Sequence, residues 1–391
     1  MSAAATARRV VVVNAAGLTN LGDDAIAAAV LADLRSTFPD ATLLATGTTG
    51  EDGDPNVEPV GFDDGSIAEA IAEADLVAIG GGGFFFDYDA RLTRAAFDRG
   101  EFFHLYPYVR AALTARSRSV PVLFYAIGVG PLVTPGGREL TYDGVSAASA
   151  VTVRDAASAL ELRRLNVTAP TPEVTADPAI SLPVPEADWT ERPSGRVIGF
   201  VARPWLRLQP SGTTPSGRAF FERYVECLAA AADAVIERLE ATPVFLAAQT
   251  WNDDDLAVAH RVVRRMRFAD RALVLPPIAT YRELQVVLRS LDALVSTRLH
   301  PLILACAAGV APVGVGLAGA KVRGFLASLG LPELAVSGWL GDTRGLSDRI
   351  ERVLHDGDAI RARLAEGVAG QRRAAARNRA AAESVASAHG R

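Results

Sequence analysis

Cysteine is scarce in this sequence. Only Cys227 and Cys306 occur, and they lie far apart in the chain. A disulfide framework or a cysteine-based zinc site needs several cysteines at short, regular spacings, so the sequence excludes both. We therefore expect two buried, small apolar side chains in a protein suited to a reducing compartment.

Long apolar runs and an excess of positive charge are also absent. No stretch of about 20 uninterrupted apolar residues occurs, so we expect no membrane span. The net charge of -5 argues against general nucleic-acid binding, which needs a basic surface, although it allows a local basic pocket. The apolar run 10–13 stops at Asn14 without a cleavage pattern, so it indicates a first strand rather than a signal peptide, and we expect a cytoplasmic protein.

The chain has an ordinary globular composition, with 391 residues, 49% hydrophobic and 22% charged. That length fits about two domains. Short apolar strands alternate with helices, and the alternation restarts after a polar, proline-rich stretch at 183–195. We therefore predict an α/β fold of two doubly wound Rossmann-like domains facing a cleft. The N-terminal domain would span 1–184, the C-terminal domain 196–356, and a C-terminal helical segment 357–391. The predicted strands are 9–13, 42–46, 75–79, 120–127, 151–153, 196–202, 243–248, 273–275, 292–296 and 311–315.

The stretch around Arg298 and His300 carries the strongest chemical signal. A buried strand is predicted to end at Ser296 and a helix to begin at Pro301, so both side chains would lie on the intervening turn. Such turns bind ligands in α/β sheets. A guanidinium can hold a carboxylate or phosphate through two hydrogen bonds, and an imidazole can move a proton near neutral pH. The alternative is structural: either side chain could cap the next segment or pair with a nearby acid.

The first domain offers different candidates. The loop 14–24 has neither the lysine of a phosphate-binding loop nor the spacing of a dinucleotide fingerprint. Asp23 and Asp24 precede a helix predicted at 25–38, where carboxylates stabilise the helix terminus. Asp23 could also accept a proton from a sugar hydroxyl. Four glycines at 80–83 would let the backbone approach a ligand or another chain segment closely.

A second acidic cluster, 253–255, invites a metal-binding interpretation. We favour a solvated helix start, since carboxylates are common at that terminus. No metal site is therefore predicted.

In order and spacing, these motifs resemble those of the polysaccharide pyruvyl transferase family over about residues 10 to 335. The matching segments are 17–26, 80–83, 127–131, 153–155, 177–179, 203–205, 298–300, 309–312 and Lys321. The resemblance implies a GT-B-like fold. It also implies transfer of the pyruvyl group of phosphoenolpyruvate (PEP) onto two hydroxyls of one sugar, with a cyclic ketal and phosphate as products.

The resemblance matches Arg298, His300, Arg203 and Lys321 to functional residues of the family. The chemistry of the transfer then suggests that His300 would protonate the PEP methylene and that Asp23 would take a proton from the attacking hydroxyl. Arg298, Arg203 and Lys321 would bind the carboxylate and phosphate of PEP. Further substrate contacts are expected from Leu299, Asn20, Gly81 and Gly82. No cofactor is implied, because PEP is the donor substrate. The sequence departs from the family at 316–320, where a tyrosine or similar polar residue is expected before Lys321.

Two other functions remain open at this point. A GT-B glycosyltransferase would need a nucleotide site in the second domain, for which no clear acid is present. A non-catalytic binding protein could use the same fold. The expected partners are PEP and a free or lipid-linked sugar acceptor, without nucleic acid. Arg372 and Arg373 could touch an anionic membrane, although a solvated helix face is favoured. The oligomeric state is left open.

Overall fold

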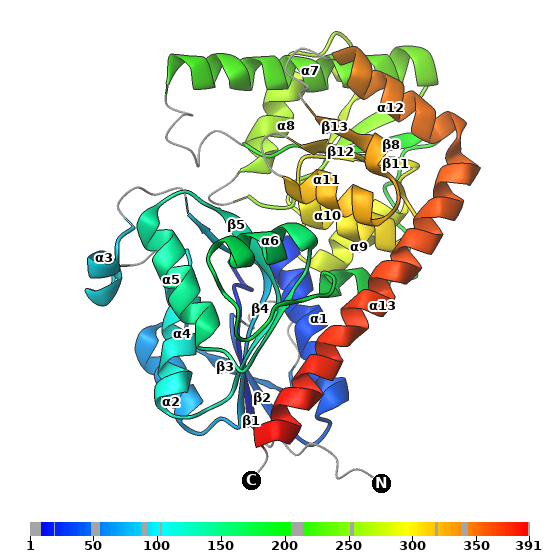
Figure 1. The fold of residues 1–391 in the computed structure, drawn as a ribbon. Helices are drawn as coiled ribbons and strands as arrows, with labels where there is room; N and C mark the ends of the chain where they lie inside the picture. Colours follow the sequence, from blue (N-terminus) through cyan, green and yellow to red (C-terminus); the bar gives the residue numbers. More distant parts are fainter. Residues whose placement is uncertain are drawn as a thin grey trace. The chain divides into compact units, whose positions relative to one another are not determined.

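The computed structural model describes residues 9–18, 20–47, 55–87, 92–101, 104–204, 214–250, 254–316, 320–337 and 343–389. The chain divides into two compact units, shown in Figure 1. Unit 1 comprises Met1–Leu18, Asp23–Ser181 and Gln371–Arg391, and unit 2 comprises Thr19–Gly22 and Leu182–Gly370. This division differs from the predicted boundaries in three places. Residues 19–22 and 182–184 belong to unit 2, and the C-terminal helical segment is shared between the units.

Unit 1 contains a parallel sheet whose described strands run in the order β3-β2-β1-β4-β5-β6-β7. The strands are β1 (Arg9–Val13), β2 (Thr42–Thr46), β3 (Val57–Val60), β4 (Leu76–Asp87), β5 (Val122–Leu132), β6 (Ala150–Val153) and β7 (Glu173–Val174). The helices are α1 (Leu21–Thr37), α2 (Asp64–Ala72), α3 (Arg94–Asp98), α4 (Tyr106–Ser117), α5 (Pro135–Ser146) and α6 (Ala156–Arg164). The order reverses between β1 and β4, which is the switch point of a doubly wound sheet.

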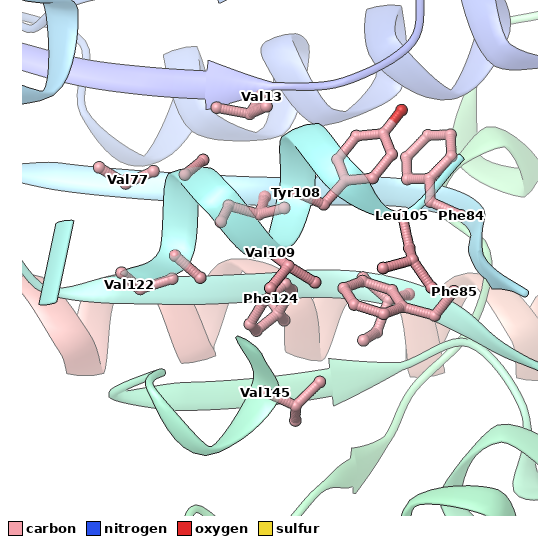
Figure 2. Packing of buried hydrophobic residues seen from close by; sticks show 14 of the residues in the cluster. Val13, Val77, Phe84, Phe85, Leu105, Tyr108, Val109, Val122, Phe124 and Val145 are labelled. Atoms are coloured by element: carbon pink, nitrogen blue, oxygen red, sulfur yellow. The ribbon is translucent and has the colours of Figure 1, made fainter. Parts of the chain in front are cut away.

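Alternate strand residues fill the two faces of this sheet, as the period of a strand requires. Val13, Val77 and Phe124 belong to a cluster that packs beneath α4, as Figure 2 shows. On the other face, the buried Tyr125 hydroxyl donates to Asp33 of α1 at 2.7 Å. Both faces are therefore covered, which explains the near-continuous apolar strands of the sequence.

Unit 2 repeats this topology, with its described strands in the order β10-β9-β8-β11-β12-β13, all parallel. The strands are β8 (Val197–Val201), β9 (Thr242–Phe245), β10 (Leu273–Val274), β11 (Ala293–Ser296), β12 (Ala311–Gly316) and β13 (Ala335–Ser337). The helices are α7 (Pro215–Leu239), α8 (Asp255–Val263), α9 (Tyr281–Arg289), α10 (Leu299–Ala307), α11 (Ala320–Ser328) and α12 (Thr343–His355). The strand order reverses between β8 and β11.

Helix α13 (Gly357–His389), red in Figure 1, has its first part in unit 2 and its end in unit 1. Within unit 1, Asn378 is fully buried, accepts from Thr175 Oγ1 at 2.8 Å and donates to the Ala176 carbonyl at 3.2 Å. Arg377 pairs with Glu173, and Arg372 donates to the Ile180 carbonyl. These partners show why a helix without a strong apolar stripe is nevertheless held in place.

Most predicted elements are confirmed, and β1 and β2 match the predicted residues. The prediction that α1 begins at 25 is wrong, because the helix begins at Leu21. The short strands β3, β7 and β13 were not predicted, because four, two and three residues carry too little periodicity to be recognised. In the part of the chain that the structure describes, no helix is long and apolar enough to cross a membrane.

Candidate functional site

The predicted cationic residues gather at the carboxyl edge of the unit 2 sheet. Arg203 follows β8, and Arg298 follows β11, so they come from the two strands that flank the switch point. Lys321 lies in the first turn of α11, directly after the next strand, β12. Ligands of doubly wound sheets bind at this edge, so the sequence-based grouping of the three side chains agrees with the topology.

Thr297 joins the ends of β8 and β11. Its hydroxyl accepts from the backbone N–H of Arg203 at 3.0 Å and lies 3.4 Å from the Tyr224 hydroxyl. Burial raises the pKa of Tyr224, and the charges of Asp255, Arg203 and Arg298 also act on this phenol. Both arginines therefore lie close enough to Tyr224 to share one electrostatic environment.

Arg298 is almost fully buried and is paired with Asp255, which has no exposed surface. Nε of Arg298 donates to Oδ2 of Asp255, and Nη2 donates to Oδ1, both at 2.6 Å. The Asp255 carboxylate also accepts from the backbone N–H groups of Ala248 and Gln249, at 3.0 and 3.2 Å. The arginine fork predicted to bind substrate thus uses one of its edges for a protein carboxylate.

The prediction of a solvated helix start at 253–255 is wrong for Asp255. Asp254 does cap α8, accepting from the backbone N–H of Ala257 at 3.0 Å. Asp255 turns inward instead, because a buried guanidinium requires a buried counter-charge. Asp253 lies outside the described residues. Sequence reasoning raised pairing with a nearby acid for Arg298 but did not identify Asp255 as that acid.

His300 lies in the first turn of α10 and packs against the segment formed by residues 20–22. A Cβ placed on Gly22 would lie 2.3 Å from His300 Nδ1 and 2.6 Å from His300 Cβ. The segment is held to unit 2 by its backbone, since Leu21 N–H donates to the Ala248 carbonyl at 3.1 Å and Asn20 pairs with Gln249. Asn20 Oδ1 in turn accepts from Gly22 N–H at 3.1 Å. The structure therefore brings the predicted residues Asn20 and His300 into one neighbourhood.

The start of α10 differs from the prediction. The helix begins at Leu299 rather than at Pro301, and Arg298 is its N-cap, with extended backbone angles. Arg298 is fixed there by Ser296, whose Oγ accepts from its N–H and donates to its carbonyl. Leu299 and His300 are therefore helical residues rather than turn residues, and the imidazole gains the fixed geometry of a helix terminus.

Lys321 stands out by its residue type. It is the one lysine of the chain, and the other 39 of the 40 basic residues are arginines. Lysine differs from arginine in carrying a compact point charge on a flexible stem. The sequence uses arginine at every other basic position, and its one lysine lies in the first turn of the helix that follows β12, the strand next to β11. The departure at 317–319 lies outside the described residues.

The candidates from the first half of the chain lie at the switch point of unit 1. Asp23 and Asp24 occupy the first turn of α1, and Asp24 accepts from Gly17 N–H at 2.7 Å. The negative charge of Asp23 acts on Tyr108, a buried phenol stacked on Phe84 at 4.3 Å, whose pKa is raised mainly by burial. Figure 2 shows these two rings side by side. The predicted roles of Asp23 in proton transfer remain predictions.

Gly81 and Gly82 are buried in β4, with φ angles of +63° and +129°. A Cβ on Gly81 would lie 2.1 Å from Ile26 Cγ2 and 2.8 Å from Val30 Cγ2. Glycine is therefore required so that α1 can pack directly on the strand. Of the two alternatives raised for this tract, close approach of another chain segment is present, and contact with substrate remains a prediction.

In the described part of the chain, no group of three or more His, Cys, Asp or Glu side chains is arranged to hold a metal ion. The cations available at the unit 2 edge are protein side chains, Arg203, Arg298 and Lys321. This set suits a substrate that carries more than one negative charge.

Solved structures with the same architecture support the fold class. A proposed UDP-N-acetylglucosamine 2-epimerase from Listeria monocytogenes has a TM-score of 0.63 at 14% identity, covering 94% of this chain and 93% of that one. Anabaena Alr3699/HepE in complex with UDP has a TM-score of 0.59 at 14% identity, covering 97% and 100%. A Neisseria meningitidis UDP-GlcNAc 2-epimerase bound to UDP-GlcNAc has a TM-score of 0.57 at 11% identity, covering 94% and 97%. The protein is therefore an α/β protein with two Rossmann-like, GT-B-like domains.

The sequence profile of the polysaccharide pyruvyl transferases matches residues 20–318, which is most of the chain. The protein belongs to the polysaccharide pyruvyl transferase family and is a transferase. A search of curated proteins found no match.

Proposed function

We propose that this protein transfers the pyruvyl group of PEP onto two hydroxyls of one sugar in a polysaccharide or its precursor. The products would be a cyclic ketal and inorganic phosphate. The observation that carries the proposal is the set of cations at the unit 2 switch point, where Arg203, Arg298 and Lys321 follow three neighbouring strands beside His300.

PEP suits this set because it carries a carboxylate and a phosphate on one small carbon skeleton. Two arginines and one lysine supply the positive charge and the directional N–H donors that both anionic groups need. Arg298 has extra rigidity for this role, since Asp255 fixes its plane. Lys321 is best suited to the phosphate, whose several oxygens a point charge can follow as the bond to carbon breaks.

In the proposed reaction, His300 donates a proton to the PEP methylene, which becomes a methyl group. The neighbouring carbon then becomes electrophilic, and the first sugar hydroxyl adds to it and releases its proton to a base. We assign that role to Asp23. The phosphate then leaves with the electrons of its bond to carbon. The second hydroxyl adds at the same carbon and loses its proton, and this closes the ketal. One of the two hydroxyl protons replaces the proton that His300 gave to the methyl group, and the other is taken up by the phosphate.

The single lysine makes a specific test of donor binding possible. An amine-reactive reagent modifies only Lys321 and the α-amino terminus, and the two products are separated by peptide mapping. We expect PEP to slow modification of Lys321 at least fivefold and to leave the terminal amine unaffected, which serves as an internal control. Equal rates at Lys321 with and without PEP would contradict the assignment.

A thermal-shift comparison tests the choice of donor. A ligand that binds only the folded state raises the melting temperature by mass action. PEP should raise it, and the shift should shrink in Arg298→Lys. A shift with UDP and none with PEP would favour a nucleotide-sugar enzyme, the activity suggested by the UDP-bound proteins of similar fold. Cytoplasmic location and membrane contact stay predictions, and most arginines of α13 are paired with acids or carbonyls.

A further inference from the structure

The strongest unassigned feature is the buried carboxylate of Asp255. We propose that Asp255 is a positioning residue of the transfer reaction, acting on the donor only through Arg298. This inference rests on the proposed function, because it gives Arg298 the role of an anion-binding group. Asp255 has no exposed surface, so it reaches no substrate itself.

The contact geometry fixes the orientation of the guanidinium. A guanidinium is planar and carries five N–H groups in a rigid fork. Asp255 takes one from Nε and one from Nη2, each at 2.6 Å, so both the plane of the group and its rotation are set. The other three N–H groups point away from the carboxylate. The direction in which Arg298 can meet an anion is therefore determined by Asp255.

The carboxylate is itself held rigidly by the backbone. Oδ2 accepts from the N–H groups of Ala248 and Gln249, which follow β9, and Asp255 is the first residue of α8. Asp255 thus connects Arg298, after β11, to the end of a strand on the far side of β8. These four hydrogen bonds to two separate elements satisfy the buried carboxylate and fix its orientation. Asp255 can therefore keep the Arg298 guanidinium in one orientation while the charge on PEP changes during the reaction.

The variant Asp255→Asn separates orientation from folding. An asparagine carbonyl can occupy the place of Oδ2 and keep the contacts with Ala248, Gln249 and Nε. Its amide nitrogen would then face Nη2, and two donors cannot form a hydrogen bond. Only the second of the two hydrogen bonds that orient the guanidinium is lost. We expect the kcat of PEP-dependent phosphate release, measured with a sugar acceptor, to fall at least tenfold. The chain should stay folded in circular dichroism at the assay temperature, with a lowered melting temperature because the buried guanidinium loses its counter-charge.

Asp254→Asn is the matched control. It makes the same charge change one residue earlier, at a carboxylate that caps α8 by accepting from the Ala257 N–H. Asparagine caps helices as well as aspartate does. Its kcat should remain within twofold of wild type. A tenfold loss in this control as well would overturn the inference, because any loss of charge at this helix terminus would then suffice.

A double-variant comparison decides whether Asp255 acts through Arg298. In an Arg298→Lys background, the fork is absent, so Asp255→Asn should change kcat by less than twofold. Losses that multiply would show an action independent of Arg298 and would overturn the inference. A purely structural role would lower the melting temperature without this dependence on the residue at 298.

Measurements on the wild type distinguish a failure of this inference from a failure of the proposed function. If it releases no phosphate from PEP with any sugar tested, the proposed function fails. The same variants are then titrated by calorimetry with inorganic phosphate and with UDP. Asp255→Asn should weaken the binding of whichever anion the wild type binds at least fivefold, and only when Arg298 is present. Unchanged binding, or no binding of either anion by the wild type, would overturn the inference.

Discussion

Gly22→Ala tests the placement of the imidazole proposed as the proton donor more sharply than removing His300 would. A Cβ at Gly22 would lie 2.3 Å from His300 Nδ1, about 1.1 Å closer than the 3.4 Å at which ordinary contact begins. Rotating the ring does not relieve the overlap, because His300 Cβ lies only 2.6 Å away and moves only with the backbone of α10. Either α10 or the 20–22 segment must therefore shift by roughly 1 Å.

The expected changes in stability and in kcat follow from that displacement. Overpacking of this kind costs about 1–3 kcal/mol, partly offset by roughly 1 kcal/mol from replacing a helical glycine by alanine. A misplacement of about 1 Å can lower a rate on the order of 100-fold. We therefore expect kcat for phosphate release to fall about 100-fold, with the melting temperature lowered by only a few degrees.

Gly324→Ala is the control for this substitution. Gly324 is also helical, in α11, and nothing lies within 4 Å of its added Cβ. This variant should be slightly stabilised and keep wild-type kcat. A Gly22→Ala enzyme with wild-type kcat would refute the reasoning, since it would show that the 20–22 segment does not lie against His300.

Three further predictions concern the proton donor, a buried amide and a buried acid. His300→Gln should lower phosphate release on the order of 100-fold or more while PEP still raises the melting temperature; full activity would contradict a role as general acid. Asn378→Leu removes the amide that donates to the Ala176 carbonyl, while the Thr175 hydroxyl keeps the Val153 carbonyl as a partner, so urea unfolding should show a loss of about 1–3 kcal/mol, and an unchanged midpoint would show that these contacts are not formed. Burial raises the pKa of Asp33, so the folded chain binds that proton more tightly than the unfolded chain, and stability falls as the pH rises through this range. The melting temperature of Asp33→Asn minus that of wild type should therefore increase between about pH 4 and pH 7, and a constant difference would contradict the assigned shift.

The sheets and their order of elements were predictable because parallel strands buried on both faces appear as short apolar runs. The predicted strands at 9–13 and 42–46 match β1 and β2. Helix starts were less predictable. Pro301 favoured a first helical position, yet α10 begins at Leu299, because the side chain of Ser296 already fixes the backbone of Arg298.

The site residues were predictable as a set of cations, but their partners were not. A run of three aspartates resembles a solvated helix terminus, and only the fold shows that Asp255 turns inward to meet a residue 43 positions later. The contact of Gly22 with His300 is similarly invisible in sequence, because it joins segments almost 280 positions apart through a side chain that glycine lacks. Long-range pairing of this kind leaves no periodic signal.

The central claim is that the protein moves a pyruvyl group from PEP to a sugar diol. The most direct measurement is mass spectrometry of sugar acceptors after incubation with the protein and PEP labelled with carbon-13 in all three carbons, with phosphate quantified in the same samples. The account predicts an acceptor that gains all three labelled carbons as a pyruvyl ketal, in a one-to-one ratio with phosphate. Phosphate release without labelled sugar, or transfer from a nucleotide-sugar with PEP left intact, would contradict it.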